Sequence, residues 1–152
     1  MLHPDEVNVA GVAPIMIRTG QGKVVTIAGL GHWPKRLPAD LFMREHGGTM
    51  PLGILRTVVP AAPDAWITAL ERFGTLGFAE VAQPAVECAR DGFPLGPFVA
   101  RIIGDNEAAY RRWPTSAPIF LPGGQAPRAG QRFVQADLGR TLHYLADEDR
   151  AG

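Results

Sequence analysis

The chain has 152 residues, of which 46% are hydrophobic, and its 15 Lys and Arg residues balance its 15 Asp and Glu residues. This length can bury the core of one ordinary domain, whereas a net charge near zero, with no basic cluster longer than Arg111-Arg112, argues against nucleic acid as a partner. No apolar run approaches the roughly 20 residues that a membrane helix needs, so no membrane partner is expected either.

The first residues, MLHPDE, show neither the basic nor the apolar region of a signal peptide. This absence favours a cytoplasmic location. The single cysteine, Cys88, excludes an internal disulfide framework and by itself identifies no compartment.

Two short β-prone runs, residues 14–18 and 23–27, lie near the start of the chain. The TGQG segment at 19–22 supplies the turn chemistry of a hairpin between them. Because an isolated hairpin is marginal in water, we expect both strands to belong to a larger sheet. Residues 28–60 are rich in Gly and Pro, and only residues 40–44 predict a helical turn there.

From Pro63 onward the pattern becomes helical. The first predicted helix has Pro63 at its first position and ends at Gly74, with Trp66, Leu70 and Phe73 on one face. The second runs over residues 78–91 and ends at Gly92, and Pro84 should kink it or mark a restart. The apolar stripe of this second helix is predicted to consist of Phe78, Val81, Ala82, Ala85 and Cys88 or Ala89.

A third helix is predicted to begin near Pro97 and to stop by Trp113-Pro114, and a last one to begin at about Asp137. The third carries Phe98, Ile102 and Tyr110, and the last carries Leu138, Leu142, Leu145 and Ala146 on one side. We therefore predict an α/β class, in the form of an α+β fragment with one β-hairpin followed by mostly helices. Two strands cannot cover several amphipathic helices, so the chain is expected to be part of a larger α/β body.

No acid, base and nucleophile come together in the sequence, so no catalytic residue is predicted. Cys88 shares the apolar stripe with Ala85 and is expected to be a small core residue rather than a reactive thiolate. The glycine pairs at 47–48 and 123–124 lack the neighbours of a phosphate-binding loop, and we expect no cofactor. The four histidines have no ligand spacing and no accompanying Cys or carboxylate cluster, so no metal site is expected; they are His3, His32, His46 and His143.

Several segments, in order and spacing from about residue 11 to residue 150, resemble the gamma-glutamyltransferase family. The most specific lies in residues 72–94 and resembles the family's "(K/R)YG…QPA…LARDGF" helix pair. IFLPGG at 119–124 and FVQADLGRTL at 133–142 resemble its "IFLP-G" and "LVQ-DLA-TL" segments, and VVPAAP at 58–63 takes the place of a "(V)PG" step.

This resemblance implies an N-terminal-nucleophile hydrolase with an αββα sandwich, in which the hairpin supplies two strands and the helices pack on the outer face. The chain would be a single partial domain, residues 1–152, from the interior of the large subunit. The resemblance also implies a precursor that cuts itself, and a small subunit whose new N-terminal Thr attacks an amide. The α-amine of that Thr would act as general base and two backbone N–H groups would hold the oxyanion.

That Thr is expected on a missing partner and not in this chain, so the chain alone is predicted to be inactive. TLHY at 141–144 is superficially similar to the family's "TTHYS" start of the small subunit. However, Leu138, Leu142 and Leu145 place Thr141 on an amphipathic helical period, and no Ser follows Tyr144. We therefore reject Thr141 as the nucleophile.

Two departures from the family pattern indicate a distinct subgroup. The family has an Arg in a "D-x-R-E-x-A-P" segment, which clamps the glutamyl carboxylate of the substrate. Aligning the Pro of that segment with Pro34 puts Leu30 at the Arg position, in AGLGHWP at 28–34. We therefore name Leu30, Gly31 and His32 as candidate substrate-binding residues. The second departure is GVAP at 11–14, which replaces a denser glycine run.

Because Leu30 cannot pair with a carboxylate, an oxamate amidohydrolase-like or acylase-like branch fits better than gamma-glutamyl specificity. The leading interpretation is a large-subunit portion that contributes scaffold and a specificity loop to amide hydrolysis or acyl transfer on a small-molecule amide. The alternatives are a non-catalytic binding or assembly remnant, or a truncated reading frame without activity of its own.

Overall fold

The structure is a computed structural model that describes residues 2–151. These residues form two compact units, which are described separately. Unit 1 comprises the described residues of 1–8 and 76–152, and unit 2 comprises residues 9–75. The single partial domain expected over residues 1–152 stays a prediction.

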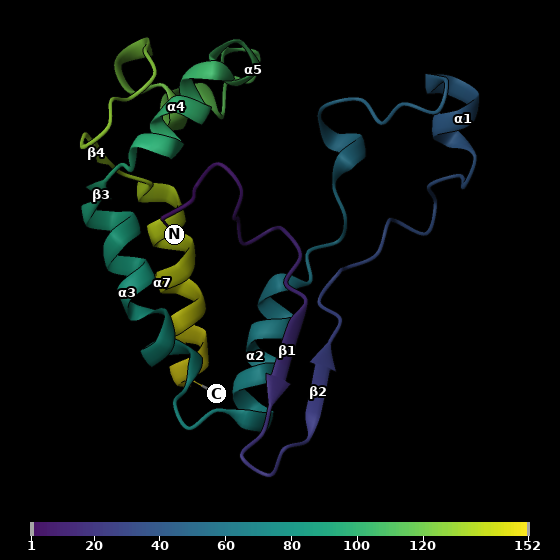
Figure 1. The fold of residues 1–152 in the computed structure, drawn as a ribbon, viewed down its shortest axis with the longest axis vertical. Coiled ribbons are helices and arrows are strands. Elements are labelled where there is room, and N and C mark those ends of the chain that lie inside the picture. Colours follow the sequence, from purple (N-terminus) through teal and green to yellow (C-terminus); the bar gives the residue numbers. More distant parts are fainter. Residues whose placement is uncertain (1, 152) are drawn as a thin grey trace. The chain divides into compact units, whose positions relative to one another are not determined.

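Unit 2 contains the predicted hairpin. Strands β1 (Ile15–Arg18) and β2 (Val24–Ile27) pair antiparallel, with Ile15 opposite Ile27 (Figure 1). The backbone N–H of Thr19 closes the turn by donating to the carbonyl oxygen of Lys23 over 2.8 Å. Half-buried and exposed residues alternate along both strands, as expected for a hairpin with one covered face. The hairpin prediction is therefore confirmed.

The main helix of unit 2 is α2 (Ala62–Phe73), which has Pro63 in its first turn and ends at Gly74, as predicted. Its buried residues are Ala62 and Ala65, and small side chains at these positions let the helix approach the neighbouring backbone closely. Between β2 and α2 lie a short helix, α1 (Leu41–His46), in the predicted helical-turn region, and a 3-10 turn, η1 (Ile54–Arg56).

In unit 1, α3 (Phe78–Asp91) lies beside α7 (Ala136–Ala151) along much of its length (Figure 1). The predicted bounds of α3 are confirmed, and the helix passes through Pro84 without restarting. The predicted stripe was wrong at Val81, which is 49% exposed. The buried face of α3 consists mostly of small residues and does not include Val81. Its buried residues are Phe78, Ala79, Ala82, Val86 and Ala89.

A second packing centre of unit 1 follows α3. Strand β3 (Phe93–Pro94) pairs antiparallel with β4 (Arg132–Phe133), a pairing that the sequence did not predict. The two phenylalanines of this pair meet edge to face, with ring centroids 6.0 Å apart. The cluster of buried side chains around them consists of Phe93, Leu95, Val99, Ile103, Leu121 and Phe133.

The predicted third helix was wrong in its length, because two helices occupy that range. Helix α4 (Pro97–Asp105) ends at Asn106, whose side-chain amide donates to the carbonyl oxygen of Ile102, and α5 (Glu107–Arg111) follows. The apolar face predicted for this helix was also wrong in α4, since Phe98 is half exposed while Val99 and Ile103 are buried. A short helix, α6 (Ala117–Phe120), and a 3-10 turn, η2 (Pro122–Gly124), complete the unit.

Candidate functional site

The candidate substrate-binding residues lie in the segment 28–34, called the Leu30 loop below. This segment begins where β2 ends and belongs entirely to unit 2. The Leu30 side chain is 55% exposed, and His32 is exposed as well, whereas Gly31 between them is half-buried. The loop therefore presents two side chains to solvent on either side of a covered backbone position.

Gly29 holds the first end of the Leu30 loop. Its carbonyl oxygen accepts a hydrogen bond from the backbone N–H of Ala13 over 2.7 Å, two residues beyond the Ile15–Ile27 pair in the same register. Its φ of +52° lies in the left-handed region, and a Cβ there would lie only 2.1 Å from the carbonyl oxygen of Ala13 and 2.9 Å from the Cβ of Ala65. Only glycine fits this position without movement of the surrounding backbone.

Gly31 and His32 hold the second end of the loop. Gly31 has a φ of +69°, and a Cβ there would lie 2.2 Å from the carbonyl oxygen of Val59. The carbonyl oxygen of His32 accepts a hydrogen bond from the backbone N–H of Val59 over 2.8 Å. Leu30 is thus carried on a short backbone arch whose two ends are bonded to different segments of unit 2.

An aromatic contact follows the arch. The Trp33 ring lies with its centroid 5.3 Å from that of Phe42 in α1, and Phe42 in turn lies 6.1 Å from His46. These tilted rings connect the Leu30 loop to α1 within unit 2. His32 and His46 both lie in unit 2.

Among residues 2–151, no group of three His, Cys, Asp or Glu side chains could hold a metal ion. None of the described helices is both long enough and apolar enough to cross a bilayer. Cys88 is half-buried and packs against the cluster of buried side chains in unit 1, which agrees with its predicted structural role.

Thr141 lies well inside α7, and its hydroxyl donates to the carbonyl oxygen of Asp137 over 3.0 Å. This bond to the preceding turn is a common local arrangement of helical threonines. The helical period that led us to reject Thr141 is thus observed. Leu142 and Ala146 of the same helix are buried, as their predicted face requires.

Residues 89–94, the last part of the most specific family motif (residues 72–94), form a packing joint in unit 1. Ala89 is fully buried, and its carbonyl oxygen accepts the backbone N–H of Gln135 over 2.9 Å. Gly92 has a φ of +80°, and a Cβ there would lie 2.9 Å from the carbonyl oxygen of Phe133. The motif therefore joins the end of α3 to the segment that leads from β4 into α7.

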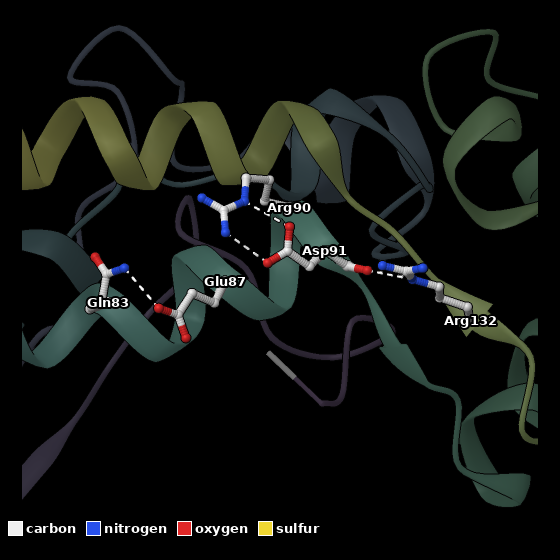
Figure 2. A network of polar contacts seen from close by, with 5 residues as sticks. All are labelled: Gln83, Glu87, Arg90, Asp91 and Arg132. Carbon is white, nitrogen blue, oxygen red and sulfur yellow. Dashed lines mark hydrogen bonds and ion pairs between the residues drawn. The ribbon is translucent and has the colours of Figure 1, made fainter.

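Polar contacts surround this joint (Figure 2). The Arg90 guanidinium donates two hydrogen bonds to the Asp91 carboxylate, each 2.7 Å long, and the Arg132 side chain donates to the backbone carbonyl of Asp91. Its hydrogen bonds with Arg90 lower the pKa of the Asp91 carboxyl below its ordinary value, and the same contact raises the pKa of Arg90. Both side chains are exposed, so the pair adds little to stability.

The family model described as Gamma-glutamyltranspeptidase matches residues 1–152. Among curated proteins, the chain is 35% identical over 156 aligned residues to the Acylase ACY 1 proenzyme of Pseudomonas sp. strain V22, covering 96% of this chain and 28% of that protein. It is 36% identical over 125 residues to the Glutathione hydrolase-like YwrD proenzyme of Bacillus subtilis strain 168, covering 81% of this chain and 23% of that protein. The chain thus spans about a quarter of the length of these relatives.

Two solved structures share the fold. The Helicobacter pylori gamma-glutamyltranspeptidase superposes with a TM-score of 0.89 at 22% identity, covering 97% of this chain and 44% of that chain. The cephalosporin acylase from Bacillus halodurans superposes with a TM-score of 0.83 at 25% identity, covering 97% of this chain and 29% of that chain. The expected fold class, a hairpin followed by mostly helices as in part of an N-terminal-nucleophile hydrolase, is confirmed. With a family model that matches residues 1–152 and with relatives of this kind, the chain belongs to the gamma-glutamyltranspeptidase family.

Proposed function

We propose that this chain is a large-subunit portion of an amidohydrolase of the N-terminal-nucleophile type, to which it contributes scaffold and a substrate-specificity loop. The observation that carries the proposal is the half-exposed Leu30 side chain on an arch fixed at both ends. Loops that are held by a rigid frame often carry binding residues. The arch follows a strand of the hairpin, and the packing joint at residues 89–94 supplies structure rather than chemistry.

The reaction we propose is amide hydrolysis or acyl transfer through an acyl-enzyme. A Thr at the N-terminus of a small-subunit partner attacks the amide carbonyl, and its own α-amine takes the hydroxyl proton and passes it to the amine that leaves as the C–N bond breaks. The acyl group is then released to water or to an amine acceptor. This chain would supply neither the nucleophile nor the base, which agrees with the position of Thr141 within α7. The relatives named above are called proenzymes, which supports a partner made by processing of a precursor.

The substrate class follows from Leu30. An Arg at this position can hold a carboxylate through two charge-assisted hydrogen bonds, and losing such a contact costs about 2–5 kcal/mol. A leucine can offer only apolar contact, so we propose an amide whose acyl part has no free carboxylate beside Leu30. The acylase among the relatives is in keeping with a substrate other than a gamma-glutamyl amide.

The proposal is tested by producing this chain together with a small-subunit segment of the family that begins with a Thr-Thr-His-like sequence. A complex of the two with amidase activity on simple acyl anilides is the expected result. A folded complex that is inert on every amide offered would contradict the enzyme function and favour a binding or assembly module instead.

The specificity assignment is tested in the same complex with Leu30→Arg. The ratio of the rate on a gamma-glutamyl anilide to the rate on an apolar acyl anilide should rise by about tenfold or more. Leu52→Arg is the matched control, because Leu52 is an equally exposed leucine (58%) of unit 2 outside the Leu30 loop. If both variants change the ratio equally, or neither does, then Leu30 is not at the specificity position.

A further inference from the structure

The Leu30 loop is held by backbone contacts and not by the side chain that it presents. Between residues 28 and 34 the two fixed points are the carbonyl oxygens of Gly29 and His32, which accept N–H groups from Ala13 and Val59. Leu30, between them, is 55% exposed. Two different parts of unit 2, the segment before β1 and the segment before α2, thus hold one exposed residue.

The two glycines beside Leu30 make this arrangement possible. Both have positive φ values, +52° at Gly29 and +69° at Gly31, which side chains other than glycine rarely adopt. At both positions an added Cβ would also clash with a backbone carbonyl oxygen, at 2.1 Å from that of Ala13 for Gly29 and at 2.2 Å from that of Val59 for Gly31. Positive φ and close approach are two independent requirements for glycine, and they coincide on both sides of the same residue.

Strained or glycine-only backbone that brackets a presented side chain is characteristic of positions that must be held in a fixed geometry. A ligand that contacts such a side chain does not have to order the loop first, which lowers the entropic cost of binding. Charged side chains are missing from the arch itself, because residues 28–31 are Ala, Gly, Leu and Gly. The Leu30 side chain therefore offers an apolar contact to a ligand, whereas the exposed His32 beside it is polar.

We propose that Gly29 and Gly31 are positioning residues, which fix Leu30 as a preformed apolar contact for the acyl group of the substrate. This inference rests on the proposed function for the identity of the ligand, whereas the fixed geometry of the arch belongs to this chain alone. The two parts are tested by separate measurements.

The geometry is tested on the 152-residue chain by amide hydrogen exchange. In the Leu30→Ala variant, the amides of Ala13 and Val59 should keep their protection to within about twofold, because both hydrogen bonds involve backbone atoms only. In Gly29→Ala and Gly31→Ala, the exchange of the Ala13 or Val59 amide should become faster by about tenfold or more. Gly20→Ala is the matched control, since a Cβ at Gly20 meets no atom within 4 Å.

The amide of Gln135, which donates to Ala89 within unit 1, reports whether a variant has lost its fold elsewhere. A loss of protection at Ala13 and Val59 in Leu30→Ala would overturn the proposal, since Leu30 would then hold the loop by burial. Unchanged protection in both glycine variants would overturn it equally.

The role toward substrate is tested in the amidase complex described above. Gly31→Ala should raise the KM for an apolar acyl anilide by about tenfold while kcat changes less, because a displaced Leu30 weakens binding of the acyl group. A KM unchanged from that of the Gly20→Ala control would contradict the positioning role. If the complex shows no amidase activity at all, the proposed function fails, while the exchange measurements still decide whether the two glycines fix the arch.

Discussion

The backbone N–H of Gln135 donates to the carbonyl oxygen of Ala89 over 2.9 Å and so joins the start of α7 to the end of α3. Four residues further along α7, Gly139 lies against the same place, where a Cβ would be 3.2 Å from the backbone nitrogen of Arg90. The two helices can approach this closely because Ala89 and Gly139 present almost no side chain.

The close approach at Gly139 gives a first prediction. Gly139→Leu should lower the free energy of unfolding by about 1–3 kcal/mol, because the added side chain forces α3 and α7 apart. Urea unfolding followed by circular dichroism measures the change. Glu148→Leu, at an exposed position of the same helix, serves as the control and should change stability by less than about 0.5 kcal/mol. Equal effects of both substitutions would show that the two helices do not require a glycine here.

The second prediction concerns Asp149, near the end of α7. Its carboxylate accepts the backbone N–H of Ala79 over 3.0 Å and thereby caps the first turn of α3 from another helix. Asp149→Ala should cost about 0.5–2 kcal/mol, the usual range for loss of an N-terminal cap. Thermal unfolding measures this cost. The neighbouring Glu148→Ala should leave the melting temperature unchanged, and a similar drop in both variants would argue against the cap.

The third prediction compares two phenylalanines. Phe133 is 1% exposed and lies between Phe93 and Phe120, with ring centroids 6.0 Å from each. Phe133→Ala should therefore destabilise unit 1 by about 3–5 kcal/mol, the range for deleting a buried aromatic ring. Phe98→Ala, at a half-exposed site of α4, should cost far less. A larger loss for Phe98 than for Phe133 in urea unfolding would contradict the placement of the core.

The fourth prediction follows from the lowered pKa of Asp91. The pKa of the Asp91 carboxyl is lower in the folded chain than in the unfolded chain. At pH values between these two pKa values the unfolded chain binds more protons, so the free energy of unfolding rises with pH in that range. The contribution is fully present above the ordinary aspartate value of about 3.9 and is lost as the pH falls through the lower folded value. Unfolding free energies measured against pH should fall less steeply toward acid in Asp91→Asn than in the unaltered chain.

The partner of Asp91 supplies the control for this pH dependence. Arg90→Gln removes the hydrogen bonds that lower the pKa, and should flatten the same acid limb. Glu148→Gln, which removes an exposed carboxylate of α7, should leave that limb as it was. Since Asp91 is exposed, the effect is small, and identical pH profiles in all four proteins would refute the assignment.

Local signals in the sequence predicted the bounds of α3 to the residue and the two strands of the hairpin to within one residue. Gly92 ends α3, and TGQG between two β-prone runs specified the hairpin, because caps and turns depend on neighbouring residues. The break at Asn106 was missed because the helical period continues across it. The pairing of Phe93 with Phe133 was missed because two-residue strands forty positions apart leave no local pattern.

The faces of the helices were predicted less well than their bounds. Val81 and Phe98 are large and apolar and were assigned to the core, yet both are half exposed. The choice of face is set by the partner, and α7 accepts the alanines of α3 where a larger side chain would not fit. In the Leu30 loop, sequence comparison located the position of interest, whereas the contacts of Gly29 and Gly31 became visible only in three dimensions.

The packing joint at residues 89–94 also bears on how far a sequence motif can assign a member of this family to a substrate class. Ala89 is fully buried and Gly92 lies too close to the carbonyl oxygen of Phe133 to carry a Cβ, so a match at these two positions reflects packing. Substrate preference, on the proposal made above, resides in a side chain outside that motif. Two chains could therefore agree at every residue of the joint and still differ in what they hydrolyse, and an inspection of position 30 would separate them.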